Sequence, residues 1–351
     1  RHITKMKYRI YVLNVFWIIM LISISCSEAN KPIIPSKIET SLHQKANAYI
    51  SPLPSFDIDN KSDLEVLRIN LGKKLFLDSL LSFNQTQNCS TCHILDKYGV
   101  DNKRVSEGDN GRTGTRNTPT IYNASLQFAQ FWDAHVKTIE EQASGPLFGT
   151  DEMGLPDTTF LINRLKNESN YLVLFDLAYP DKDTTITIET IVNSLGEFQK
   201  TLITSGDRFD KYLKGDYNAI SQQEKSGLNL FIDKGCIPCH SGSLIGGNME
   251  QKFSIYGYYW DYTGSTFFDK GKYKHTKEDN DKFVFKVPSL RNVTMTYPYF
   301  HDGSVDNLAK AIQIMAQSEL NTTLTEEEVE DIEAFLGSLT GEIPNIDFKR
   351  N

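Results

Sequence analysis

Cys89-Ser90-Thr91-Cys92-His93 is the stretch of sequence that decides the fold, and Cys236-Ile237-Pro238-Cys239-His240 repeats its pattern later in the chain. In a C-x-x-C-H string the two thiols bond covalently to the vinyl groups of a haem, and the adjacent imidazole ligates the iron. The two strings therefore predict two covalently attached c-type haems.

Other uses of paired cysteines fit these strings less well. A redox C-x-x-C pair does not need the histidine that follows each string. A zinc site gathers its ligands in one small module, whereas these strings lie far apart in the sequence. The strings use four of the five cysteines and leave only Cys26, so no pair remains for a structural disulfide.

The length of 351 residues suggests about two domains. Because the haem strings are well separated, we expect one haem in each domain. The formal net charge of −8 does not favour nucleic acid as a partner. A basic small redox protein suits this charge better, since opposite charges speed encounter.

Residues 1–25 have the pattern of an export signal, with basic residues followed by an apolar run over residues 10–24. This run is shorter than the roughly 20 residues that span a bilayer. Residues 22–26 end in Cys26 and resemble a bacterial lipoprotein signal, in which that cysteine is lipidated; an uncleaved anchor and plain secretion are the alternatives. We expect a signal peptide at 1–25, a lipidated tether and linker at 26–60, and a folded part in the periplasm.

Helical spacing of apolar residues predicts a helix over residues 63–76 that leads into the first haem string. Capping boxes that begin at Ser221 and Thr325 predict helices before the second string and near the end of the chain, the last one closed by Gly341. Residues 96–120 predict a long loop of the kind that is usually functional. Residues 241–285 show little periodicity and predict irregular surface structure.

A set of short segments between about residues 60 and 342 follows the motif order of one family, which is more specific than either haem string. The segments are Leu71-Gly72-Lys73-Lys74-Leu75-Phe76, Arg116-Asn117-Thr118-Pro119-Thr120, Gln130-Phe131-Trp132-Asp133, Glu141-Gln142-Ala143, Glu152-Met153-Gly154, Phe209-Asp210-Lys211-Tyr212-Leu213, Pro288-Ser289-Leu290-Arg291-Asn292-Val293 and Tyr297-Pro298-Tyr299-Phe300-His301-Asp302-Gly303. They resemble the bacterial dihaem cytochrome c peroxidases and their relatives. The resemblance implies a mainly α fold of two cytochrome-c-like domains, which we place at 61–205 and 206–342, in a homodimer.

The resemblance also implies a division of labour between the haems. The N-terminal haem, on His93, is the peroxidatic one with an open iron face, and the C-terminal haem, on His240, relays electrons. Met315 occupies the position of the family's thioether ligand to the second iron, and a His/Met pair raises the haem potential. The alternatives are that Met315 is a core methionine on a helical stripe and that Met295 is the ligand.

Gln142, Pro146 and Glu152 resemble the distal pocket over the first haem. Cleavage of a peroxide O–O bond needs a base and then an acid, and one carboxylate can do both. Without the resemblance Glu152 would be read as a solvated charge. Trp132 matches the aromatic residue between the haems that carries electrons, although core packing also explains it.

Calcium is inferred by resemblance alone. Asn117, Thr296 and Pro298 match positions that supply oxygen ligands to an inter-domain calcium ion in the family. Sites of this kind that use backbone carbonyls cannot be recognised from spacing.

One position departs from the family pattern. Many members carry a histidine after Ser-x-Gly in the loop behind the first haem, which blocks the peroxidatic iron until the other haem is reduced. Here the run is Ser106-Glu107-Gly108-Asp109. We expect Asp109 to stay solvated rather than enter a haem pocket, and peroxide to react without prior reduction. His135 is the first candidate for another blocking ligand.

The expected activity is reduction of hydrogen peroxide to two waters, with electrons from a small periplasmic donor such as a monohaem cytochrome c and membrane contact only through the lipidated N-terminus. One alternative is a dihaem oxidase that modifies residues of a partner protein, as in maturation of methylamine dehydrogenase. A tyrosine replaces the methionine ligand in that branch, so Met315 argues against it. The other alternative, a non-catalytic dihaem electron carrier, has no need of Gln142 and Glu152.

Overall fold

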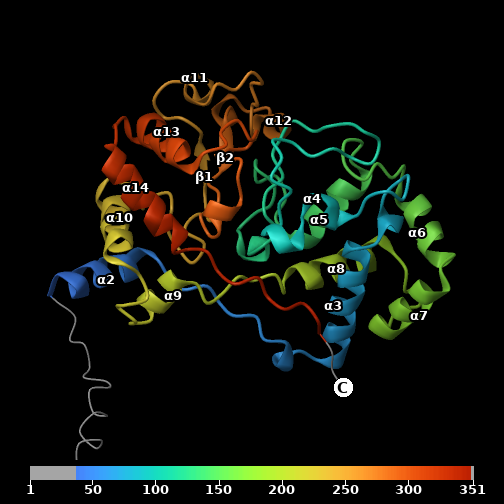
Figure 1. The fold of residues 1–351 in the computed structure, drawn as a ribbon. Helices are drawn as coiled ribbons and strands as arrows, with labels where there is room; N and C mark the ends of the chain where they lie inside the picture. The colour runs from blue at the N-terminus through green and yellow to red at the C-terminus, as the bar shows by residue number, and fades with distance from the viewer. Residues whose placement is uncertain (1–36, 349–351) are drawn as a thin grey trace, which may run out of the picture. The chain divides into compact units, whose positions relative to one another are not determined.

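The computed structural model describes residues 37–348, which are mainly helical as expected (Figure 1). Residues 1–25 and Cys26 lie outside the described residues, so the signal peptide and the lipidated cysteine stay predictions. Within the described range, no helix combines the length and apolar character needed to cross a bilayer. The compact unit that begins at Leu42 holds both haem strings.

The helices differ greatly in length. In the described part of the chain, two short strands form a small antiparallel ladder in which Glu250 pairs with Lys286. The α-helices are α2 (Lys37–Tyr49), α3 (Asp63–Phe76), α4 (Cys89–Cys92), α5 (Ile139–Phe148), α6 (Thr158–Lys166), α7 (Ser169–Ala178), α8 (Ile188–Gln199), α9 (Arg208–Leu213), α10 (Gln222–Asp233), α11 (Tyr259–Thr263), α12 (Tyr273–Thr276), α13 (Leu308–Leu320) and α14 (Glu326–Gly337). The strands are β1 (Glu250–Lys252) and β2 (Val284–Lys286), and the short 3-10 helices are η1 (Ile58–Asn60), η2 (Ser79–Leu81), η3 (Leu95–Lys97), η4 (Ala124–Leu126), η5 (Asp279–Asp281) and η6 (Val293–Met295).

The first hydrophobic core is built on the pair α3 and α8, which bury one apolar face of each helix. A glycine lets the two backbones approach, because a Cβ on Gly72 would lie 1.8 Å from the carbonyl oxygen of Ser194. Beside this contact the rings of Phe76 and Phe198 pack with centroids 5.3 Å apart. The capping box at Ser62 fixes the start of α3 and so the entry to the first haem string.

The second core repeats the same construction with α10 and α14. A Cβ on Gly227 would lie 1.8 Å from the carbonyl oxygen of Asp331, and the rings of Phe231 and Phe335 lie 5.3 Å apart. The capping boxes at Ser221 and Thr325 are present as predicted. Each haem string is thus preceded by a helix that crosses a later helix at a glycine.

Several boundaries differ from the expectations. Helix α14 ends at Gly337 rather than at Gly341. A Cβ added at Gly341 would lie 2.0 Å from the carbonyl oxygen of Thr204, so Gly341 allows a close approach between two segments instead of closing the helix. Part of the expected linker is packed, because Ala46 and Ile50 are buried in the second core. The irregular stretch 241–285 is only partly superficial, since it includes fully buried residues such as Tyr259.

Candidate active site

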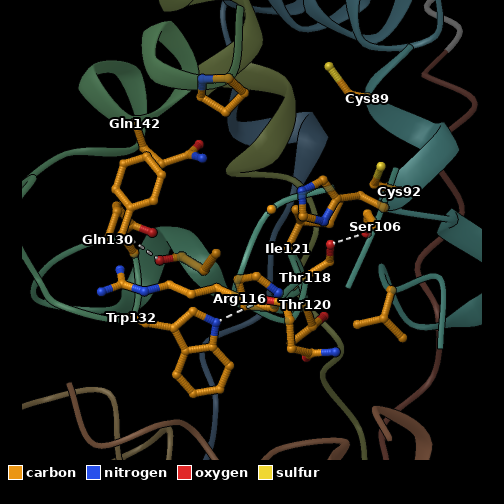
Figure 2. Close-up of a pocket in the computed structure, with 18 of the residues that line it drawn as sticks. Cys89, Cys92, Ser106, Arg116, Thr118, Thr120, Ile121, Gln130, Trp132 and Gln142 are labelled. Carbon is orange, nitrogen blue, oxygen red and sulfur yellow. Dashed lines mark hydrogen bonds between the residues drawn. The ribbon is translucent and has the colours of Figure 1, made fainter. Parts of the chain in front are cut away.

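The first haem string lies at one side of a cavity of about 440 Å³. Figure 2 shows Cys89 and Cys92 on one side of this pocket, with Gln142 and Trp132 across from them. The cysteines form the single turn of α4, and the backbone N–H of His93 donates to the Cys89 carbonyl at 2.9 Å. The local fold therefore directs two thiols and an imidazole towards the same cavity.

The second string lines a smaller cavity of about 220 Å³, where Cys236, Cys239 and His240 meet Met315 of α13. The walls around them are largely apolar and include Phe231, which also packs in the second core. Burial raises the pKa of the Cys236 thiol to about 11 and that of the Cys89 thiol to about 12.

The histidine of each haem string is oriented and protonated as an iron ligand requires. The Nδ1 atom of His93 lies 3.1 Å from the Gly99 carbonyl oxygen, and that of His240 lies 3.3 Å from the Ile245 carbonyl oxygen. Because a carbonyl only accepts, Nδ1 must carry the proton and Nε2 keeps the lone pair that an iron ligand needs. Burial lowers the pKa of His93 and lowers that of His240 to about 4, so the imidazoles stay neutral. Two thiols, a neutral imidazole and an apolar wall in each cavity fit a c-type haem.

Met315 is better placed as a second ligand than Met295. Met315 lines the second cavity together with His240. Met295 belongs to η6 and is 41% exposed, and among the described residues it lines neither cavity.

The predicted distal residues Gln142, Pro146 and Glu152 all line the first cavity. Gln142 and Pro146 both come from α5, whose start is fixed by the capping box at Thr138. Pro146 lies inside the helix rather than in a turn after it, and its carbonyl accepts from the backbone N–H of Met153 at 3.1 Å. This bond folds the segment that carries Glu152 back onto α5.

Glu152 is positioned by a tight turn. Its backbone N–H donates to the Gly149 carbonyl at 3.0 Å, and that of Gly154 donates to the same oxygen at 2.9 Å. Glu152 is an exposed residue, yet the protein atoms packed around its carboxyl group desolvate that group and, with Asp151 nearby, raise its pKa to about 7. A carboxyl group with this pKa can both accept and donate a proton near neutral pH.

Gly149→Ala is expected to displace the Glu152 carboxylate without unfolding the chain. The Gly149 backbone has φ −63°, which suits alanine, but a Cβ there would lie 2.3 Å from Glu152 Oε2. We expect peroxide turnover to fall by about tenfold to a hundredfold, because misplaced catalytic groups cost rates of this order. Gly337→Ala is the matched control, since a Cβ there meets nothing within 4 Å. Equal turnover of the two variants, with equal haem content, would show that this turn does not position Glu152.

Trp132 lines both cavities, as expected of a residue between the two haems. Its Nε1–H donates to the Asn117 carbonyl at 2.9 Å, and its own carbonyl accepts from the backbone N–H of Lys286 at 2.7 Å. Its ring meets that of His301 edge to face, with centroids 6.5 Å apart. These contacts hold the indole in one orientation between the cavities.

Sequence reasoning missed Lys286, which also lines both cavities. Its Nζ donates to the Ala129 carbonyl at 2.9 Å, and burial lowers its pKa to about 7. A lysine is normally read as an exposed residue, and no local pattern marks this one as buried. His301, which the sequence marks only as part of a family segment, is also deeply buried, with 2% of its surface exposed.

The three residues matched to the calcium site, Asn117, Thr296 and Pro298, line the first cavity together. The side-chain amide of Asn117 donates to the Lys103 carbonyl at 2.9 Å. Calcium binding by these residues stays a prediction.

The expectation that Asp109 is solvated is wrong. Asp109 is only 8% exposed, and its carboxylate accepts from the Thr86 hydroxyl at 2.6 Å and from the backbone N–H of Asn84. Burial alone would raise its pKa, but these hydrogen bonds outweigh burial and lower it. Partners in the protein replace the lost water, which a sequence-based estimate could not foresee.

Asp109 also holds the loop behind the first haem string against the segment of Glu152. Its backbone N–H donates to the Glu152 carbonyl at 2.8 Å, and Gly108 approaches so closely that a Cβ would lie 2.4 Å from the carbonyl of Asp151. His135, the residue suspected of blocking the first iron, hydrogen-bonds to Asp133 and, among the described residues, is not one that lines the first cavity.

Residues 67–218 match the family described as di-haem cytochrome c peroxidase. The chain is 37% identical to cytochrome c551 peroxidase of Nitrosomonas europaea over 87% of each chain, and 36% identical to cytochrome c551 peroxidase of Pseudomonas aeruginosa over 88% of this chain and 89% of that one. The crystal structure of a MauG-like protein associated with microbial copper homeostasis has a TM-score of 0.71 at 28% identity and covers 90% of this chain and 96% of its own. The chain therefore has the family's fold of two cytochrome-c-like domains and its two haems, and it belongs to the di-haem cytochrome c peroxidase family.

Proposed function

We propose that the chain is a periplasmic peroxidase that catalyses H2O2 + 2 e⁻ + 2 H⁺ → 2 H2O. The electrons arrive one at a time from a small redox protein such as a monohaem cytochrome c. The observation that carries the proposal is the carboxyl group of Glu152, with a pKa of about 7, on the cavity that also holds the first haem string. The similarity to two cytochrome c551 peroxidases agrees with it.

The haems, when bound through Cys89, Cys92 and His93 and through Cys236, Cys239 and His240, supply the electrons and the centre at which the O–O bond is cleaved. Ionised Glu152 removes a proton from one peroxide oxygen. The resulting carboxylic acid returns that proton to the other oxygen, which leaves as water. The two protons consumed overall come from solvent.

Gln142 and Trp132 complete the proposed machinery. Gln142 has an amide that can hydrogen-bond to peroxide in the first cavity, and it donates no proton to the reaction. Trp132 lines both cavities and so offers an aromatic bridge for the electrons that pass from the second haem to the first.

The placement of Met315 on the second cavity supports the peroxidase over an enzyme that oxidises a partner protein. A thioether ligand raises the haem potential, which suits a site that accepts electrons from a small carrier. The presence of Gln142 and Glu152 on the first cavity disfavours a non-catalytic electron carrier.

The fully oxidised protein is expected to react with peroxide without a reductive lag. The Asp109 carboxylate accepts hydrogen bonds from Asn84 and Thr86. It is therefore not free to act as a blocking ligand to the first haem iron. Electron paramagnetic resonance should show a high-spin ferric signal from the first haem, and stopped-flow mixing with peroxide should show an immediate reaction. Two low-spin signals with a lag that pre-reduction removes would contradict this expectation. His135→Ala would then show whether His135 is the blocking ligand.

Finer features are proposed on two resemblances, that of the chain to the family and that of residues 22–26 to a lipoprotein signal. They are a calcium ion held by Asn117, Thr296 and Pro298, a homodimer, domain limits at 61–205 and 206–342, and periplasmic anchoring through a lipid on Cys26. Chelation of calcium followed by measurement of turnover and of mass in solution tests the first two. Mass spectrometry of the N-terminal peptide from membranes tests the lipid.

A further inference from the structure

A cluster of metal-ligating side chains lies outside the haem cavities. Ligand atoms of Asp133, His135 and His275 lie within 4.8 Å of one another. The Asp133 side chain is only 1% exposed, whereas the His135 and His275 side chains are 27% and 44% exposed. A buried carboxylate is therefore covered by two imidazoles that solvent can reach.

Two segments distant in sequence build this cluster. Asp133 and His135 belong to a short turn closed by the hydrogen bond from the Gln130 backbone N–H to the Val136 carbonyl at 2.8 Å. His275 comes from α12. The imidazoles of His135 and His275 stack with centroids 3.9 Å apart, and the Phe131 ring supports His135 from 4.5 Å.

Both oxygens of the Asp133 carboxylate take part. Oδ1 accepts from Nδ1 of His135, and Oδ2 lies 3.2 Å from Nε2 of His275. Arg116 donates to Oδ2 at 2.7 Å and holds Asp269 at 2.6 Å with its Nε. Arg116 therefore orients the carboxylate from its buried side, as outer partners do for metal ligands.

We propose that Asp133, His135 and His275 bind a divalent transition-metal ion of the Zn²⁺ or Cu²⁺ class, with water in the remaining position. Two imidazoles and one carboxylate are a ligand set that such ions favour, whereas Ca²⁺ and Mg²⁺ prefer oxygen ligands only. The stacked rings lie 11° from parallel, so their lone pairs do not yet converge on one point. His275, the more exposed of the two, must turn about its side-chain torsions to complete the site.

Such an ion would join the segment that follows Trp132 to the segment that carries α12. Asp133 directly succeeds Trp132, which lines both haem cavities. The site is separate from the residues that hold the haems and from those matched to calcium, and the proposal does not depend on peroxidase activity.

The test is calorimetric titration of the untagged, dihaem protein with Zn²⁺ in buffer that contains excess Ca²⁺. The expected result is one Zn²⁺ bound per chain, with binding weakened at least about tenfold in His135→Ala and in His275→Ala. His43→Ala is the matched control, because His43 lies outside the cluster and contacts the Leu213 carbonyl at 3.2 Å. The haem absorption spectrum of each variant shows that the fold is kept.

Cu²⁺ provides a second readout on the same proteins. Its paramagnetic resonance spectrum should show nitrogen coupling in the parent and in the His43→Ala control, and that coupling should be reduced when either cluster histidine is replaced. Absence of stoichiometric Zn²⁺ binding, or unchanged binding in the double variant His135→Ala/His275→Ala, would overturn the proposal.

Discussion

Replacing Glu152 by glutamine is expected to keep both haems and to lower peroxide turnover by about a hundredfold or more. Glutamine preserves the size of the side chain, but its amide cannot take a proton from peroxide and return it. The comparison is steady-state turnover of parent and variant with the same reduced cytochrome, after haem content has been equalised. Turnover within about threefold of the parent would remove Glu152 from the mechanism.

The pH dependence gives a second check on the same residue. The pKa of Glu152 is raised from its usual 4.5 to about 7, so the base form is lost as the pH falls below about 7. We therefore expect kcat/KM of the parent to decline on the acid side of neutrality, by about tenfold per pH unit well below the pKa. Glu152→Gln should lose this acid limb, whereas Gly337→Ala should keep it.

Met315→Leu is expected to lower the potential of the second haem by ~100 mV or more, within the ~0.8 V range over which axial ligands tune haems. Leucine conserves most of the volume but has no sulfur to ligate iron. Any sulfur-to-iron charge-transfer band should disappear, and turnover should fall because the relay haem accepts electrons less readily.

Potentiometric titration followed by absorption of each haem measures this effect. The first haem should be largely unchanged, since Met315 lines only the second cavity. Met295→Leu is the control, and it should leave both potentials in place. If instead Met295→Leu shifts the second haem and Met315→Leu does not, the ligand role passes to Met295.

Features set by local sequence were predictable. The haem strings need only the spacing of Cys89, Cys92 and His93, and the capping boxes at Ser221 and Thr325 need only a hydroxyl and a carboxylate three residues apart. The placing of Gln142, Glu152 and Met315 on the cavities followed from the family resemblance rather than from periodicity. Their catalytic and ligand roles stay predictions.

Features set by contacts between distant segments were not predictable. Asp109 was expected in solvent because nothing in its own neighbourhood shows that Asn84 and Thr86 would supply its hydrogen bonds. His135 was suspected as a blocking ligand. Its ring instead stacks on that of His275, which comes from a segment without helical periodicity, and the two belong to another cluster. In each case the partner residue comes from another segment of the chain, and no sequence pattern shows that the two residues will be in contact.

The most direct test of the account is steady-state reduction of hydrogen peroxide by the dihaem protein, with a reduced monohaem cytochrome c as donor. The account predicts that two molecules of the cytochrome are oxidised for each peroxide consumed, and that this activity is lost in Glu152→Gln with both haems in place. A fully haem-loaded parent that oxidises the cytochrome no faster with peroxide than without it would contradict the account.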